Sequence, residues 1–407
     1  MHARLLAATA LIAVASALPT AAQDLDLARA DGTLRIATFN ASLNRFNAGE
    51  LITALSDPAS LQPARVAEII QRVHPDIVLI NEFDFDEDGE AARLFVENFL
   101  GIGQNGAAPW VAEAWFTAPS NTGVPSGLDF NRDGNPAGPD DAYGFGFFPG
   151  QYGMLVLSKY PIATGDIRTF RNFLWRDMPD ALLPDDPETP EPADYYSPEI
   201  LDVFRLSSKS HWDVPVIVGG TTIHILASHP TPPVFDGPED RNGTRNHDEV
   251  RFWTDYIMPE ASAYIVDDAG IAGGLAADAS FVIVGDLNLD PHDGDGIREM
   301  GRTLLALPRL QDPMPSSAGG PEDATADGGK NADHTGDPAL DTADFADTGE
   351  FDPGNLRADY VLPSSDLTVA GAGVFWPVAA DPLAALLMAG ETQTSDHRLV
   401  WVDIALD

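Results

Sequence analysis

Short apolar runs that end in polar side chains constrain the fold of this chain more than any other feature of its sequence. The run at 281–284 leads through Gly285 to Asp286 and Asn288. Residues two apart in a strand share one face, so we expect these two side chains to point the same way. Such a pair suits a metal ion or a reacting water. It also suits an ordinary turn, because Asp and Asn are common where strands end.

The apolar pattern as a whole predicts an α/β fold with mixed sheets. Helices are expected at 63–74, at about 90–100 and at 248–264, where apolar residues recur at helical spacing. Gly219 and Gly220 separate two strands and indicate a hairpin turn. Helices alternate with strands early in the chain, whereas later strands pair directly, which favours mixed sheets. The expected strands are 33–40, 76–82, 153–158, 214–220, 221–229, 281–284, 359–362 and 399–404.

Three long segments do not follow this pattern. Residues 103–150 are rich in Gly, Pro and Asn, residues 178–198 are rich in Pro, Asp and Glu, and residues 313–354 are acidic with few apolar side chains. We interpret them as surface insertions into one domain that spans residues 23–407, and we expect the third to form a loop near the site.

The first 22 residues have the composition of a secretory signal peptide. Arg4 provides a positive start, residues 5–18 are apolar, Pro19 breaks the helix, and small residues follow at 20–22. The apolar run is too short to span a bilayer, and no later run is long enough either. We therefore expect export to the bacterial periplasm or beyond, with no transmembrane segment.

The charge balance is strongly acidic. Lys and Arg total 23 against 63 Asp and Glu, a formal net charge of −40, and there is no cysteine. Such a surface repels nucleic-acid backbones, which proteins usually bind through several Lys or Arg contacts. An exported chain without disulfides must be stabilised by its core, which is possible at this length. A monomer is the expected state.

Polar residues stand at the ends of most of the expected strands. Strand ends in one sheet converge on an edge where loops build sites, so we expect these side chains to lie together. The set is Asn40, Glu82, His229, Asp286 with Asn288, and Asp396 with His397.

The motifs that carry these residues resemble those of the endonuclease/exonuclease/phosphatase superfamily, in the same order. They are IATFN, DIVLINEFD, ILASHP, IVGDLNLDP, RADYVLP and SDHRLVWV, and from first to last they span residues 36–404, nearly the whole mature chain. The resemblance implies a four-layer α/β/β/α sandwich of two mixed sheets flanked by helices. It also implies a secreted bacterial enzyme that cleaves a phosphoester with a divalent metal.

The resemblance further implies a role for each polar strand end. Asp286 orients or deprotonates the attacking water, His229 donates to the phosphate or the leaving oxygen, and Asp359 orients His397. Tyr152 either contacts the phosphate or is an ordinary aromatic residue of the core or rim. The catalytic set is thus His229, Asp286, Asn288, His397, Asp359 and Tyr152, and the metal set is Asn40, Glu82 and Asp396.

Elementary chemistry supports such roles. A phosphodiester is anionic, so attack by water requires a cation at its oxygens and a group that activates the water. A hard cation such as Mg²⁺, with Mn²⁺ or Ca²⁺ as alternatives, provides the first when carboxylates hold it. Carboxylate and His side chains provide the second.

The substrate class stays open at this level. A small phosphomonoester or phosphodiester and a phospholipid headgroup suit the acidic surface, and DNA or RNA is the alternative substrate. A non-catalytic calcium-binding surface protein is a further alternative. His211, Arg245 and His247 either bind substrate or are structural residues.

Residues 129–140 match the spacing of a twelve-residue calcium loop. Asp129, Asn131 and Asp133 occupy positions 1, 3 and 5, and Asp140 occupies position 12. Nearby prolines argue against the helices of an EF-hand. A structural calcium site and a solvated acidic turn are both compatible with this loop, and a similar run begins at Asp84.

Overall fold

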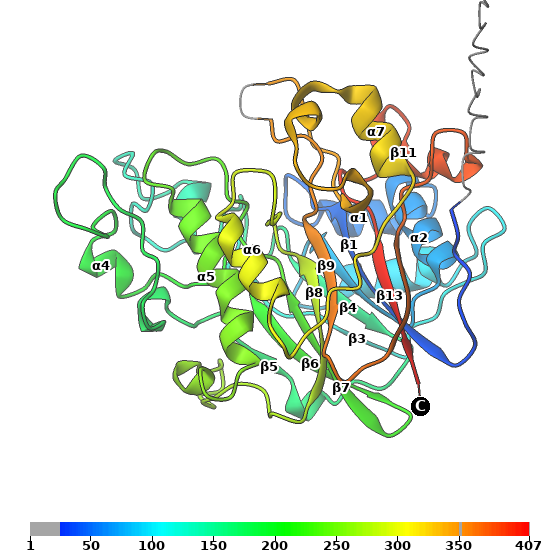
Figure 1. Ribbon diagram of the computed structural model, residues 1–407, viewed down its shortest axis with the longest axis horizontal. Coiled ribbons are helices and arrows are strands. Elements are labelled where there is room, and N and C mark those ends of the chain that lie inside the picture. Colours follow the sequence, from blue (N-terminus) through cyan, green and yellow to red (C-terminus); the bar gives the residue numbers. More distant parts are fainter. Residues whose placement is uncertain (1–24, 350–351, 407) are drawn as a thin grey trace, which may run out of the picture.

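The computed structural model describes residues 25–349 and 352–406, which form two mixed β-sheets packed face to face (Figure 1). The first sheet contains β1 (Thr33–Leu43), β2 (Ile77–Phe83), β3 (Ala114–Phe116), β4 (Met154–Ser158), β10 (Val369–Val374) and β13 (Val400–Ala405), in the order β10-β13-β1-β2-β4-β3. The second contains β5 (Arg168–Thr169), β6 (His211–Val218), β7 (Thr221–Ser228), β8 (Ser280–Asp286) and β9 (Asp359–Pro363), in that order. A short ribbon pairs β11 (Met388–Ala389) with β12 (Thr392–Gln393).

Helices cover the outer face of each sheet, so the fold has four layers. The first sheet is covered by α1 (Glu50–Ser56), α2 (Leu61–Val73) and α3 (Glu90–Phe95), which continues into a π-helical turn at Val96–Leu100. The second is covered by α5 (Arg241–Tyr256) and α6 (Arg298–Leu305). Two further helices, α4 (Pro198–Leu201) and α7 (Gly319–Asp327), lie outside the sheets (Figure 1). The predicted α/β/β/α sandwich is confirmed.

The layers explain why the central strands are continuous apolar runs. In β8, Val282 and Val284 belong to the core between the sheets, while Phe281 and Ile283 belong to the core under α5. A strand covered on both faces has no solvent side, so it lacks the alternation of an exposed strand. All four side chains are fully buried.

The predicted hairpin at Gly219 and Gly220 is confirmed, and both glycines have positive φ, which suits a two-residue turn. The helix expected at 248–264 begins earlier, at Arg241, and ends at Tyr256. Its first two turns are polar and have no apolar repeat. They are held by polar contacts instead, for example from Arg245 Nε to the Leu206 carbonyl at 2.9 Å.

Several elements have no signal in the apolar pattern. Strand β10 consists of small residues and is held by its backbone pairing with β13. Helix α7 lies within 313–354, so the expectation of a loop throughout that segment is wrong; its two glycines and one proline disfavour a helix in isolation. The predicted signal peptide, residues 1–22, lies outside the described residues. Within the described part of the chain, no helix has the length and apolar character to cross a membrane.

A buried ion pair joins the first strand to the last. The Arg35 guanidinium, on β1, donates to both carboxylate oxygens of Asp403, on β13, at 2.7 Å each, and also to the Val73 carbonyl at 2.8 Å. The two side chains are 2% and 5% exposed. Burial makes such a pair costly to break, because removal of one partner leaves the other charge without compensation.

We therefore expect Arg35→Ala to lower the free energy of unfolding by about 3–5 kcal/mol, measured by urea denaturation. The control is Arg93→Ala, because Arg93 pairs with Glu90 and Glu97 on the exposed surface, where ion pairs add little. Equal midpoints for the two variants would contradict the importance of the buried pair.

Candidate active site

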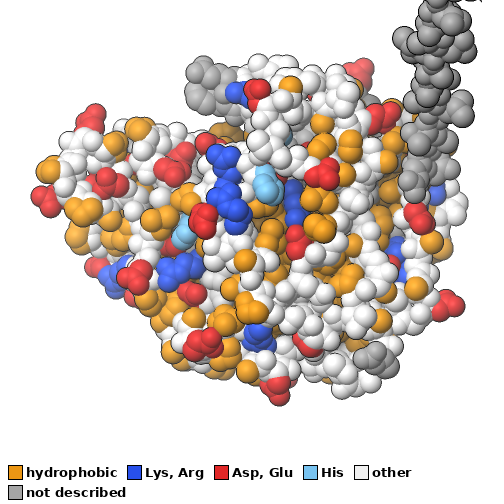
Figure 2. Space-filling model, viewed as in Figure 1, with side chains coloured by type: hydrophobic (Ala, Val, Ile, Leu, Met, Phe, Trp, Pro, Cys, Tyr) orange, Lys and Arg blue, Asp and Glu red, His pale blue; other side chains and the backbone are white. Residues whose placement is uncertain are grey.

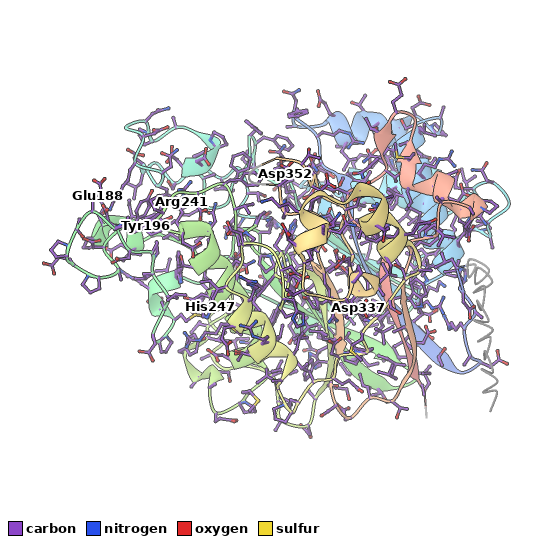
Figure 3. The ribbon with its side chains drawn as sticks, turned by 45° about the horizontal axis from the view of Figure 1, so that its top comes forward. Glu188, Tyr196, Arg241, His247, Asp337 and Asp352 are labelled. Carbon is purple, nitrogen blue, oxygen red and sulfur yellow. The ribbon has the colours of Figure 1, made fainter. Side chains whose placement is uncertain are left out.

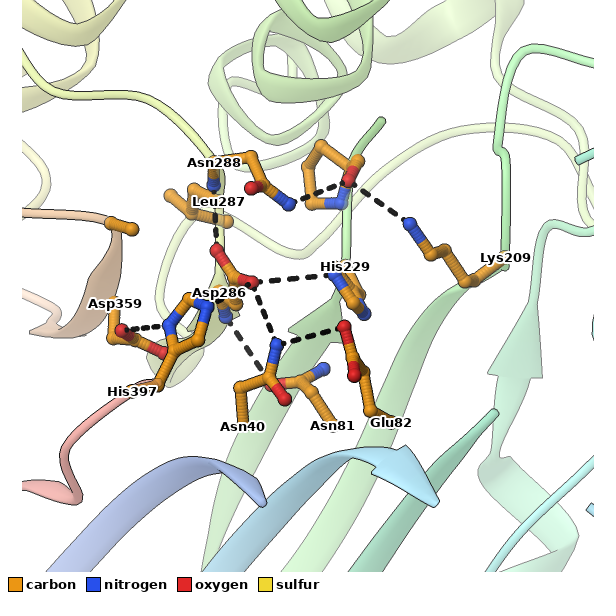
Figure 4. A network of polar contacts seen from close by, with 12 residues as sticks. Asn40, Asn81, Glu82, Lys209, His229, Asp286, Leu287, Asn288, Asp359 and His397 are labelled. Atoms are coloured by element: carbon orange, nitrogen blue, oxygen red, sulfur yellow. Dashed lines mark hydrogen bonds and ion pairs between the residues drawn. The ribbon is translucent and has the colours of Figure 1, made fainter. Parts of the chain in front are cut away.

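The ends of six strands meet at one edge of the two sheets, and their polar residues form one network (Figure 4). Strands β1 and β2 are parallel, as are β7 and β8, so their last residues share this edge. Strands β9 and β13 run the opposite way, so their first residues lie there too. The register pairs Asn40 with Asn81 and Asp286 with Asp359.

Asp286, the last residue of β8, is the centre of the network. Its Oδ2 accepts a hydrogen bond from Asn40 Nδ2 at 3.0 Å and lies 3.3 Å from His229 Nε2 and 3.6 Å from His397 Nε2. Burial raises the pKa of Asp286, but the charge of His397 and the hydrogen bond from His229 outweigh burial and lower it. The carboxylate therefore stays ionised and can accept a hydrogen bond from a water molecule.

A glycine allows this carboxylate to lie beside His229. Gly285 has φ +149°, and a Cβ at this position would be 2.1 Å from the Ser228 carbonyl oxygen. Strands β7 and β8 thus approach too closely here for any side chain. Burial and the nearby Lys209 charge lower the pKa of His229 to about 4, so its imidazole is neutral.

His397 is held by a carboxylate. Its Nδ1 lies 2.8 Å from Oδ2 of Asp359, and the same oxygen accepts a hydrogen bond from Thr342 Oγ1 at 2.8 Å. The ring of Phe345 packs edge-on against the imidazole, with centroids 5.2 Å apart. Burial opposes a charge on His397, but Asp359 and Asp286 together raise its pKa well above the ordinary value. An imidazolium held in this way can stabilise an anionic phosphate.

Glu82 lies on the other side of the network, in a left-handed backbone conformation with φ 58°. Its two carboxylate oxygens accept hydrogen bonds from Asn40 Nδ2 at 3.2 Å and from Asn44 Nδ2 at 2.6 Å. Burial and the negative charge of Asp396 raise the pKa of Glu82 to about 7. Two carboxylates that repel each other in this way are the natural ligands of a cation.

The carboxylate oxygens at Glu82 suit a hard divalent cation as ligand atoms, because such cations prefer negatively charged oxygens. Glu82 and Asp396 are the carboxylates of this set, and Ser42 Oγ holds Asp396 Oδ1 at 3.0 Å. Asn40 was predicted as a metal ligand, but its side chain makes hydrogen bonds to neighbouring residues. Its Nδ2 donates to Glu82 and Asp286, and its Oδ1 accepts the Ser42 N–H, so in this structure it links the carboxylates.

Asn288 does not share a strand face with Asp286, contrary to expectation. Strand β8 ends at Asp286, and Asn288 has a left-handed backbone with φ 50°. Its N–H donates to Asp286 Oδ1 at 2.9 Å, while its side-chain amide donates to the Pro230 carbonyl at 3.1 Å. Asn288 thus fixes the Asp286 carboxylate through its backbone.

The remaining candidates separate into two groups. Tyr152, half-buried, lines a cavity next to Glu82. His211 is buried and bonded through both ring nitrogens, and His247 pairs with Asp248, so both are structural. Arg245 donates to three backbone carbonyls of the surrounding loops.

In the candidate calcium loop, the structure replaces one of the predicted ligand residues by its neighbour. The structure groups the carboxylates of Asp129 and Asp133 with that of Asp141, all within 4.8 Å of one another. Asp140, at the counted twelfth position, is exposed and lies outside this group. Asn131 accepts the Asp133 N–H through its side chain. At the similar run that begins at Asp84, both oxygens of that carboxylate accept backbone N–H groups.

Sequence reasoning missed three residues of the network. Asn81 is fully buried; its Oδ1 accepts the Asp286 N–H at 3.2 Å and its Nδ2 donates to the Ser228 carbonyl at 3.3 Å. Thr342, from the segment 313–354, holds Asp359, and Lys209 is buried beside His229. An Asn inside the apolar run of DIVLINE was a signal for the first. Nothing in the sequence marks the other two.

Comparison with known proteins places this geometry in a family. The sequence matches the Endonuclease/Exonuclease/phosphatase family over residues 37–397. No curated protein matches the chain. Among solved structures, an endonuclease/exonuclease/phosphatase from Beutenbergia cavernae is 17% identical, with 92% of this chain and 72% of that chain covered and a TM-score of 0.46. A mannosyl-6-phosphatase from Bacteroides thetaiotaomicron is 14% identical, with 92% and 100% covered and a TM-score of 0.43.

The fold and the site together define a metal-dependent hydrolase that acts on ester bonds. The chain belongs to the endonuclease/exonuclease/phosphatase family, because the match covers most of its length. Members of this family use divalent metals.

Asn81 offers a test of how the network is held. Asn81→Ala leaves the Asp286 N–H and the Ser228 carbonyl without their partner, so we expect a loss of about 1–3 kcal/mol of stability. We also expect a lower kcat for ester hydrolysis, because Asp286 is no longer fixed. Urea denaturation and steady-state kinetics measure the two effects, and a variant with unchanged kcat would contradict a positioning role.

Proposed function

We propose that this chain hydrolyses a phosphoester by direct attack of a water molecule that Asp286 orients. The observation that carries the proposal is the convergence on one carboxylate of Asn40 from the first sheet and His229 from the second, with His397 at 3.6 Å. A water, a phosphorus atom and a leaving oxygen require such a set of acceptors and donors in one place.

Glu82 and Asp396 are the proposed ligands of the metal, with Mg²⁺ as the proposed ion and Mn²⁺ or Ca²⁺ as alternatives. When bound, the cation neutralises phosphoryl oxygens and favours attack at phosphorus. Asn40 keeps Glu82 and Asp286 in fixed relative positions, since its amide donates to both.

The proposed step conserves atoms and charge. The oxygen of water forms a bond to phosphorus, and the P–O bond to the organic group breaks. Asp286 takes one proton of the water and later releases it to solvent, from which the departing oxygen takes a proton. His229, a neutral imidazole, donates a hydrogen bond from Nε2 to Asp286 at 3.3 Å and keeps its own proton. His397, held by Asp359, stabilises the negative charge on the phosphoryl oxygens.

A small phosphoester fits this protein better than a nucleic acid. The net charge is −40, and acidic side chains are spread over the face in Figure 2, with Lys and Arg gathered near α6. A polyanion approaching this surface is repelled, which lowers its association rate. We also propose export, on the composition of residues 1–22; N-terminal sequencing of the secreted protein tests it, with cleavage expected after Ala22.

The first test removes the charge at the centre of the network. We expect Asp286→Asn to lower kcat about 100- to 10,000-fold on bis(p-nitrophenyl) phosphate, the range for loss of a general acid or base. Asp295→Asn, at an exposed position of the following loop, is the matched control and should retain activity. Equal activity of wild type and Asp286→Asn would reject the proposed role.

The second test concerns the metal. Mg²⁺ at about 100 times its Kd should stabilise the wild type by about 2.7 kcal/mol, seen as a rise in Tm, and chelator should reverse the rise. Glu82→Gln should lose this effect, since it removes a charged ligand. Asp129→Ala serves as the control, because it removes a carboxylate of the candidate calcium loop, which groups with Asp133 and Asp141, and leaves the network intact. An equal Mg²⁺ effect in Glu82→Gln would place the ion elsewhere.

A further inference from the structure

A cavity of about 500 Å³ opens directly beside the catalytic network. Glu82 and His229 form part of its wall, so a phosphate held at the network lies at its mouth. A volume of this size suits a small molecule. Six aromatic rings form the largest group in the remaining wall: Phe130, Phe145, Tyr152, Tyr196, Phe204 and Phe235.

The aromatic wall comes largely from segments outside the two sheets. Phe130 and Phe145 belong to the segment 103–150, and Tyr196 belongs to 178–198. Phe204 packs against Phe130 and Tyr196, with centroids 4.7 and 4.8 Å apart, so the inner wall is closely packed. Figure 3 shows Tyr196 and Arg241 close together at the start of α5, on the side of the molecule formed by these segments.

Two rings of the wall are exposed in the described structure. Phe145 is 47% exposed and Phe235 is 86% exposed. Exposed rings at the mouth of a cavity indicate an apolar partner, since their transfer out of water on binding is favourable. Because this cavity is continuous with the network, the partner is the organic part of the substrate.

Of the three cations in the cavity wall, Lys209 has the fewest polar contacts. Arg241 pairs with Glu239, and Arg245 donates to backbone carbonyls. The Lys209 side chain, in contrast, is buried, and its Nζ makes one hydrogen bond, to the Pro230 carbonyl at 3.3 Å (Figure 4). Among the described residues, no carboxylate oxygen lies within 4.0 Å of Nζ. Glu249, Glu82 and Asp286 act on Lys209 only from a longer distance. A buried ammonium group without a close ion pair is costly, and an anionic oxygen beside it lowers that cost.

We propose that the cavity binds the aromatic or similarly apolar group of a small soluble phosphoester, and that Lys209 binds a phosphoryl oxygen of that substrate. This inference rests on the proposed function. The aromatic wall selects the organic group, whereas Lys209 acts on the phosphate that all such substrates share.

The first experiment compares two phosphomonoesters that differ in their organic group. Wild type with Mg²⁺ should show kcat/KM at least about tenfold higher for 1-naphthyl phosphate than for glycerol 3-phosphate, the size expected for one buried ring. The double variant Phe145→Ala, Phe235→Ala should lose most of this preference, measured as the ratio of the two kcat/KM values. Ile271→Ala, which truncates an exposed apolar residue elsewhere, is the control.

The second experiment concerns Lys209. Lys209→Met should raise KM for both esters about 10- to 100-fold, because a hydrogen bond to a charged group is lost. Lys330→Met, a half-buried lysine outside the cavity, should leave both values unchanged. Calorimetry of 1-naphthylmethylphosphonate binding in chelator gives a readout without turnover, and circular dichroism shows whether each variant is folded. If Lys209→Met does not fold, the ring variants still decide the substrate class.

The outcomes separate the two proposals. Hydrolysis of both esters with equal kcat/KM overturns the aromatic site and leaves the proposed function intact. Faster cleavage of plasmid DNA or of phospholipid vesicles, unchanged in the ring variants, also overturns it. No hydrolysis of any phosphoester in the panel overturns the proposed function itself.

Discussion

A seam of hydrogen bonds between the two sheets, at one of their edges, determines the rest of the site. Asn81 of the first sheet bonds to the backbone of β7 and β8 in the second, and Asn40 and His397 reach across to Asp286 and Asp359. The core between the sheets is apolar, so the buried polar side chains at its edge must form hydrogen bonds with the opposite sheet. The same contacts that satisfy them bring acid, base and cation ligands together. Stability and chemistry therefore depend on one set of bonds, and a loss of register in either sheet would separate them.

Much of the fold could be predicted because the two sheets are covered on both faces. Strands such as β2 and β8 are continuous apolar runs, so the polar residues at their ends could be recognised from the sequence. The start of α5 and the strand β10 could not, because polar contacts and backbone pairing hold them instead of an apolar repeat. In the site, Asp286 and Glu82 stand where strands end, whereas Thr342 comes from a segment without pattern and reaches Asp359 only through tertiary folding. The strand-face argument failed at Asn288, since the strand ends two residues earlier.

The acidic surface and the cavity differ in the ligands that they favour. The net charge of −40 disfavours polyanions at long range, whereas Lys209, Arg241 and Arg245, which line the cavity, can act only at short range, which suits the small phosphoester proposed above. The segments 103–150 and 178–198 extend the wall of the site away from the sheets. In the function proposed above, residues at the strand ends act on the phosphate and residues of the loops bind the organic group, a division that many enzymes share.

The position of β13 has a consequence for the folding of the newly synthesised chain. This strand, formed by residues near the end of the described chain, inserts between β10 and β1, and Asp403 within it pairs with Arg35. His397 lies just before this strand in the sequence, so it reaches the site when β13 pairs. The ribosome must therefore synthesise the chain as far as β13 before β1, which pairs with β2 on its other side, gains this second neighbour, and the site stays incomplete until then.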